Sequence, residues 1–157
     1  MTQSAHTSLV TRRINAPRHA VYEAFVDPDK LVIWRVPNSM TGKIHHFEAR
    51  AGGEYRMSLT YIKPAESLGG KSTEDTDTFT GRFVQLIPDE KIVEVIEFES
   101  PDPRFVGHMT MTTTLRDVDG GTEISILAEN IPPGVDPADN EQGTEESLAK
   151  LAALVER

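Results

Sequence analysis

The sequence predicts an α+β fold in which a curved antiparallel sheet of about seven strands wraps around a long C-terminal helix. Three observations predict it. Apolar and polar residues alternate with period two from Lys43 to Asn130, which is typical of strands with one buried face. One strand and two short helices are expected before this region, and one long amphipathic helix after it. A bent sheet holding a terminal helix covers every apolar face in that order.

The chain opens with a strand signal at Ser8–Asn15 and two short helices in tandem. Proline is tolerated at the first position of a helix, so Ala16-Pro17 and Asp27-Pro28 are expected to begin these helices. The Asp27 side chain can also cap free backbone N–H groups. Residues at helical spacing form the expected buried stripes: Val21, Ala24 and Phe25 in the first helix, and Leu31 and Trp34 in the second.

Six strands are expected between Lys43 and Asn130, and Tyr55–Tyr61 shows the cleanest alternation. Residues Lys63–Thr76 contain Pro, Gly, Ser and acidic residues without periodicity, which predicts a loop. Asp119-Gly120-Gly121 predicts a hairpin turn. The last strand is expected over Thr122–Ala128.

The C-terminal segment predicts an amphipathic helix over Thr144–Glu156. Asp136-Pro137 offers an earlier start, which would place Gly143 inside the helix at a cost of about 1 kcal/mol relative to Ala. We expect the apolar side chains of this helix to pack on the concave face of the sheet. They are Leu148, Leu151 and Val155.

Length and composition predict one domain over residues 1–157, soluble and cytoplasmic. The 157 residues contain no cysteine, which excludes disulfides, thiolate nucleophiles and Cys-based zinc sites. No apolar run approaches the roughly 18 residues of a membrane helix, and the first eight residues lack a signal-peptide core. A membrane role is therefore not expected.

The net charge of −9 argues against a nucleic-acid partner, because affinity for nucleic acid comes largely from Lys and Arg on phosphates. The charge is uneven: residues 1–63 carry 9 Lys and Arg against 5 Asp and Glu, and residues 64–157 carry 7 against 20. This unevenness indicates either a contribution to solubility or a basic docking face near the N-terminus. A homodimer or another protein partner stays open.

Several motifs along nearly the whole chain point to one family. They are Ala16-Pro17 with Val21, Phe25, Asp27-Pro28, Leu31 and Trp34, then Phe47 to Gly52-Gly53, Gly81-Arg82-Phe83 to Pro88, Gly121-Thr122 and Ser147–Leu154. The sequence resembles the START-like helix-grip (SRPBCC) superfamily, and within it bacterial homologues of the activator of heat-shock protein 90 ATPase, also labelled polyketide-cyclase-like. The resemblance implies a helix-grip fold, which hosts carriers, cyclases and co-chaperone domains.

The chain departs from this family at three positions. Many relatives have a tryptophan pair where this chain has Trp34-Arg35, and a Gly-Trp where it has Gly143-Thr144. Ala128 stands where relatives often place a histidine. These departures imply a cavity of different shape or lower reactivity, and the family offers no shared catalytic motif to carry over.

No phosphate loop, dinucleotide fingerprint or nucleophile elbow is present, so we predict no cofactor. His45-His46 are adjacent on an expected strand, so their rings should point to opposite faces. The run Glu74-Asp75-Thr76-Asp77 does not fit a calcium-binding loop. The sequence therefore predicts no metal site.

The expected strand Ile92–Glu99 carries the best candidate for chemistry. Alternation places Glu94 on the more apolar face and Glu97 on the opposite one, and a carboxylate in apolar surroundings can orient a ligand or act as general acid or base. Thr113 is expected beside Glu94 as a hydrogen-bond partner, and Arg12 as a counter-charge across the cavity. The alternatives are a solvated Glu94 at the rim or a register shifted by one residue.

Three functions remain open from the sequence. The first is binding of a small, largely apolar ligand between sheet and terminal helix, with Trp34 at the cavity mouth. The second is a cyclase, hydrolase or dehydratase using Glu94, and the third is a co-chaperone-like interaction domain. The expected ligand-binding residues are Trp34, Tyr55, Met57, Tyr61, Phe83, Glu94, Met109, Met111 and Thr113.

Overall fold

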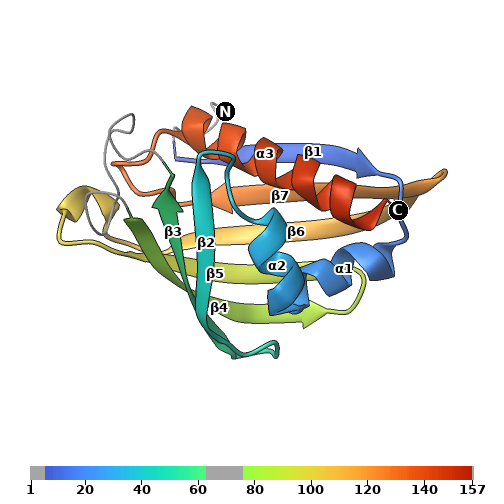
Figure 1. The fold of residues 1–157 in the computed structure, drawn as a ribbon, viewed down its shortest axis with the longest axis horizontal. Helices are drawn as coiled ribbons and strands as arrows, with labels where there is room; N and C mark the ends of the chain where they lie inside the picture. The colour runs from blue at the N-terminus through green and yellow to red at the C-terminus, as the bar shows by residue number, and fades with distance from the viewer. Residues whose placement is uncertain (1–5, 63–75, 157) are drawn as a thin grey trace.

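The computed structural model describes residues 6–62 and 76–156 of the chain. Within these residues seven strands form one antiparallel sheet, and three α-helices lie against its concave face (Figure 1). The loop predicted over Lys63–Thr76 lies outside the described residues, except for its last residue, Thr76, which begins a strand. The elements are β1 Ser8–Ile14, α1 Arg18–Val26, α2 Pro28–Trp34, β2 Met40–Phe47, β3 Glu54–Tyr61, β4 Thr76–Ile87, β5 Lys91–Glu99, the 3₁₀ turn η2 Pro103–Phe105, β6 Met109–Val118, β7 Gly121–Glu129 and α3 Pro137–Val155.

The sheet has the order β1-β7-β6-β5-β4-β3-β2, so the first strand pairs with the last one, Ser8 lying opposite Ala128. The strand register shifts once in β2, between Ile44 and His46, and once in β4, between Phe83 and Gln85. Such irregularities bend a strand and increase its twist. In Figure 1, β2 and β3 accordingly run steeply across the direction of β1, β7 and β6. The α+β fold with a curved sheet and a terminal helix is thus confirmed.

The terminal helix α3 uses the earlier of its two predicted starts. The Asp136 side chain accepts a hydrogen bond of 2.9 Å from the Ala138 N–H, and Pro137 occupies the first turn. Gly143 therefore lies inside the helix. Leu148 and Leu151 are fully buried in the core, whereas Val155 is half-buried against it.

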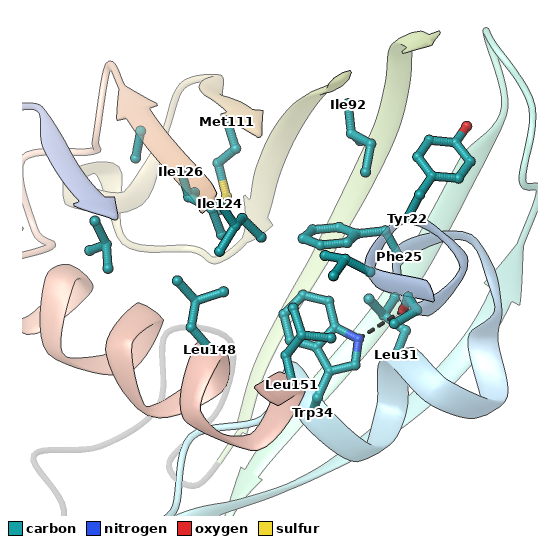
Figure 2. Close-up of a cluster of buried hydrophobic side chains, with 14 of the residues drawn as sticks. Tyr22, Phe25, Leu31, Trp34, Ile92, Met111, Ile124, Ile126, Leu148 and Leu151 are labelled. Carbon is teal, nitrogen blue, oxygen red and sulfur yellow. Dashed lines mark hydrogen bonds between the residues drawn. The ribbon is translucent and has the colours of Figure 1, made fainter. Parts of the chain in front are cut away.

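The two short helices bury the predicted stripes. The indole N–H of Trp34 donates a 2.8 Å hydrogen bond to the Ala24 carbonyl, and its ring meets Phe25 edge-on with centroids 4.6 Å apart. Figure 2 shows this group between Leu151 of α3 and Ile92 of β5. Tryptophan thereby joins α1, α2 and α3 into one apolar layer over the sheet.

Candidate ligand-binding cavity

A cavity of about 550 Å³ lies among α2, α3, the strands β3 to β7 and the connection containing η2. Its inner end is built from buried residues, including Trp34, Phe79 and Ile126, and its outer end from exposed ones, including Ser39 and Gln142. Half of the lining residues are apolar or aromatic. These are Trp34, Pro37, Met40, Leu59, Tyr61, Phe79, Ile96, Phe98, Phe105, Met109, Met111, Ile126 and Val135.

A buried ion pair lies at the inner end. The Arg35 guanidinium, which follows the last residue of α2, donates to both carboxylate oxygens of Glu94 on β5, at 2.7 and 3.1 Å. The Tyr55 hydroxyl on β3 donates a further 2.7 Å hydrogen bond to Glu94. Glu94 is 0% exposed, and the Arg35 side chain is 12% exposed and lines the cavity. Of the two charged residues in this pair, Arg35 faces the cavity and Glu94 does not.

The electrostatics of this group keep Arg35 charged and Tyr55 neutral. Burial acts to lower the pKa of Arg35, but the opposite charge and hydrogen bonds of Glu94 outweigh it, so its pKa lies above the usual value. Burial raises the pKa of Tyr55 well above its usual value. Tyr55 thus remains a hydroxyl donor to Glu94 throughout the neutral range.

Aromatic and backbone contacts hold Arg35 in place. Its guanidinium carbon lies 6.0 Å from the ring centres of both Phe25 and Trp34, within the range of cation–π attraction. The Lys150 ammonium on α3 donates to the Val36 carbonyl at 2.5 Å, which ties the residue after Arg35 to the terminal helix. The cation is thus positioned by α1, α2 and α3 together.

The structure brings four of the nine predicted ligand-binding residues to the cavity wall, and five lie elsewhere in the core. The four are Trp34, Tyr61, Met109 and Met111. The five are Tyr55, Met57, Phe83, Glu94 and Thr113, all of them at most 1% exposed. Trp34 is also only 1% exposed, so the expectation that it stands at the cavity mouth is wrong: it belongs to the inner wall.

Two expected partners of Glu94 are wrong. Thr113 lies opposite Ile92 rather than Glu94, and its buried hydroxyl has no hydrogen-bond partner among residues 6–62 and 76–156. Arg12 is exposed on β1, because that strand buries Val10 and Ile14 but not the residue between them. The counter-charge is Arg35, a residue that stands out in the sequence only as a departure from the tryptophan pair of relatives. Its signal was a lone cation between two residues that become buried, Trp34 and Val36.

Comparison with known proteins identifies the family of this chain. The model of the family described as "Activator of Hsp90 ATPase homolog 1-like protein" matches residues 15–156. The chain belongs to this family. No curated protein matches the sequence of this chain.

Solved structures agree with this membership. The crystal structure of a Chromobacterium violaceum protein is similar to this chain, with 33% sequence identity and a TM-score of 0.86. The match covers 98% of this chain and 99% of that one. A Mycobacterium smegmatis structure has 16% identity and a TM-score of 0.74, covering 96% and 91%. A Staphylococcus epidermidis solution structure has 16% identity and a TM-score of 0.76, covering 99% and 93%. The last two show a shared fold alone.

The part of the chain that the structure describes contains neither a candidate metal site nor a candidate membrane-spanning helix. No group of three or more His, Asp or Glu side chains there is arranged to hold a metal ion. No helix in those residues is both long and apolar enough to span a bilayer.

Proposed function

We propose that this protein binds a small, largely apolar molecule in the cavity between the curved sheet and α3. The observation that carries the proposal is the cavity itself. Its volume of about 550 Å³ falls within the roughly 300–1,000 Å³ of small-molecule sites. An inner end lined by buried apolar and aromatic side chains, with a charged donor, Arg35, among them, is also typical of such sites.

The enzymatic alternative, in which Glu94 acts on a substrate, has less support. A general acid or base must come within hydrogen-bond reach of the reacting group. Both oxygens of Glu94 already accept hydrogen bonds, from Arg35 and Tyr55, and the residue is 0% exposed. Ligand binding requires no movement of this pair, whereas catalysis by Glu94 does.

The alternative of an interaction domain would be favoured by a contiguous exposed apolar surface. The large exposed apolar side chains among the described residues belong instead to separate elements or connections. They are Leu9, Ile33, Ile62, Val84 and Val106.

Binding can be tested with the neutral fluorescent probe N-phenyl-1-naphthylamine. Because Trp34 is the only tryptophan and lines the cavity, its emission should change as the probe enters. Native mass spectrometry of freshly purified protein would identify any molecule already bound.

A blocking variant gives the test its control. Gly143 lines the cavity, and a Cβ there would have only Pro37 near it, at 3.9 Å. We expect Gly143→Phe to fill the space and abolish probe binding, and Gly143→Ala to retain it. Unchanged binding by Gly143→Phe would place the probe elsewhere and contradict the proposal.

A further inference from the structure

Resting on the proposed function, we infer that the cavity selects an uncharged apolar ligand with a hydrogen-bond acceptor, such as a carbonyl, at its inner end. The corresponding carboxylate is discriminated against. The inference follows from which donors Arg35 has left to offer, and from what charge remains on the Arg35–Glu94 pair.

Arg35 has N–H donors that Glu94 does not use. A guanidinium carries five N–H groups and no acceptor. Arg35 uses one N–H of Nη1 and one of Nη2 on Glu94, and Nη2 also contacts the Met111 sulfur at 3.6 Å. Its Nε–H has no acceptor among the described residues. Since Arg35 lines the cavity, the inner end holds a donor that a ligand acceptor can engage.

The bidentate contact with Glu94 neutralises Arg35 within one buried pair. A ligand carboxylate would lose its hydration and bring a second anion close to Glu94, with no unneutralised cation to compensate. A carbonyl or amide oxygen loses less hydration on entry, and it can still accept the free N–H.

Negative charges at the outer end of the cavity also repel an anionic ligand. Asp136, Asp139 and Glu146 line it, and none of the three forms an ion pair with any other described residue. Arg104, also on the lining, is held by the carboxylate of Asp102. Because Asp136 and Asp139 are exposed, salt screens them, so this share of the discrimination should fall as ionic strength rises.

The first test uses the wild-type protein with three probes of similar length: decanamide, decanoate and decane. Isothermal titration at pH 7.5, at concentrations below probe aggregation, measures each affinity. We expect decanamide to bind about tenfold or more tightly than decanoate and several-fold more tightly than decane. Equal or tighter binding of decanoate would overturn the inference but leave the proposed function standing. If neither the three probes nor N-phenyl-1-naphthylamine bind, the proposed function itself fails.

The second test reverses the preference. Glu94→Gln keeps an acceptor for Arg35 and Tyr55 but removes the neutralising charge, so decanoate affinity should rise about tenfold or more while decanamide changes less than about threefold. Glu97→Gln is the matched control, because Glu97 is exposed on the opposite face beside His108. A folded Glu94→Gln protein that still rejects decanoate would contradict the inference. If this variant does not fold, the wild-type comparison decides alone.

Discussion

Gly81 of β4 lies directly opposite Tyr55 of β3, and the ring of Tyr55 occupies the space that a side chain at position 81 would take. A Cβ built on Gly81 overlaps the outer edge of that ring and its hydroxyl oxygen. The same hydroxyl donates to Glu94. A missing side chain on one strand thus determines where the donor on the next strand reaches the buried carboxylate.

The first prediction is that Gly81→Ala destabilises the fold and displaces Tyr55. Overpacking of a filled core typically costs about 1–3 kcal/mol, and loss of the Tyr55–Glu94 hydrogen bond adds to it. Urea unfolding followed by circular dichroism measures the difference. The control is the same substitution at Gly143 within α3, where a Cβ would make only an ordinary contact, 3.9 Å from Pro37. Gly143→Ala should stabilise by roughly 0.5–1 kcal/mol. Equal effects of the two substitutions would contradict this account of Tyr55.

The second prediction separates the charge of the Arg35–Glu94 pair from its volume. Arg35→Met leaves the carboxylate of Glu94 buried with only Tyr55 as a partner, and breaking a buried pair in this way costs about 3–5 kcal/mol. Adding Glu94→Leu removes the stranded charge, so the double variant should recover most of that loss. The free energies of unfolding of the wild type, of Arg35→Met, of Glu94→Leu and of the double variant together give the coupling energy between Arg35 and Glu94. A double variant less stable than Arg35→Met alone would show that the pair stabilises by more than mutual neutralisation.

Periodicity predicted where Glu94 lies, but it could not predict what Glu94 binds. The alternation in β5 predicted that Ile92, Glu94, Ile96 and Phe98 share one face; the first three are buried, and Phe98 is half-buried on the cavity wall. Its partners come from 39 and 59 residues away in the chain. One of them, Arg35, follows the last residue of a helix whose path depends on packing, so no local pattern reveals its direction.

The site was predicted less well than the fold for a related reason. Alternation tells which face of a strand is covered, but not whether a helix side chain or open space covers it. Met57 and Phe83 were therefore expected at the ligand, yet they are 0% and 1% exposed and lie outside the cavity lining. Met109 and Met111, from the same kind of pattern, do line it.

The third prediction concerns the terminal helix. Leu151 is fully buried among residues of α2 and the sheet (Figure 2), so Leu151→Ala should cost about 2–5 kcal/mol, as other large-to-small core substitutions do. The control is Leu9→Ala on β1, where the side chain is 53% exposed and the loss should stay within about 0.5 kcal/mol. Chemical denaturation of both proteins tests the pair. A loss below about 0.5 kcal/mol at Leu151 would mean that α3 is not docked on the sheet as the structure has it.

The fourth prediction uses two threonines that are equally buried but differently bonded. Thr113 and Thr122 are both 0% exposed, yet the Thr122 hydroxyl donates to the Ala16 carbonyl at 2.7 Å. The Thr113 hydroxyl has no hydrogen-bond partner in the part of the chain that the structure describes. Valine has nearly the same shape as threonine, so each substitution mainly removes a hydroxyl. An unsatisfied buried polar group costs about 1–3 kcal/mol. Thr113→Val should therefore stabilise the protein by about 1 kcal/mol or more.

Thr122→Val should have the opposite sign, because it strands the Ala16 carbonyl and loses about 1 kcal/mol or more. Thermal and urea unfolding of the two variants measure both changes against the wild type. The two signs separate the explanations: if both substitutions destabilise, the Thr113 hydroxyl is hydrogen-bonded in solution, and this account of it is wrong. If both stabilise, the Thr122–Ala16 hydrogen bond does not offset the desolvation of its own hydroxyl. Only the predicted pair of results agrees with the structure: a gain in stability at position 113 and a loss at position 122. The Thr113 hydroxyl would then be unpaired on β6, next to the strand β5 that carries Glu94.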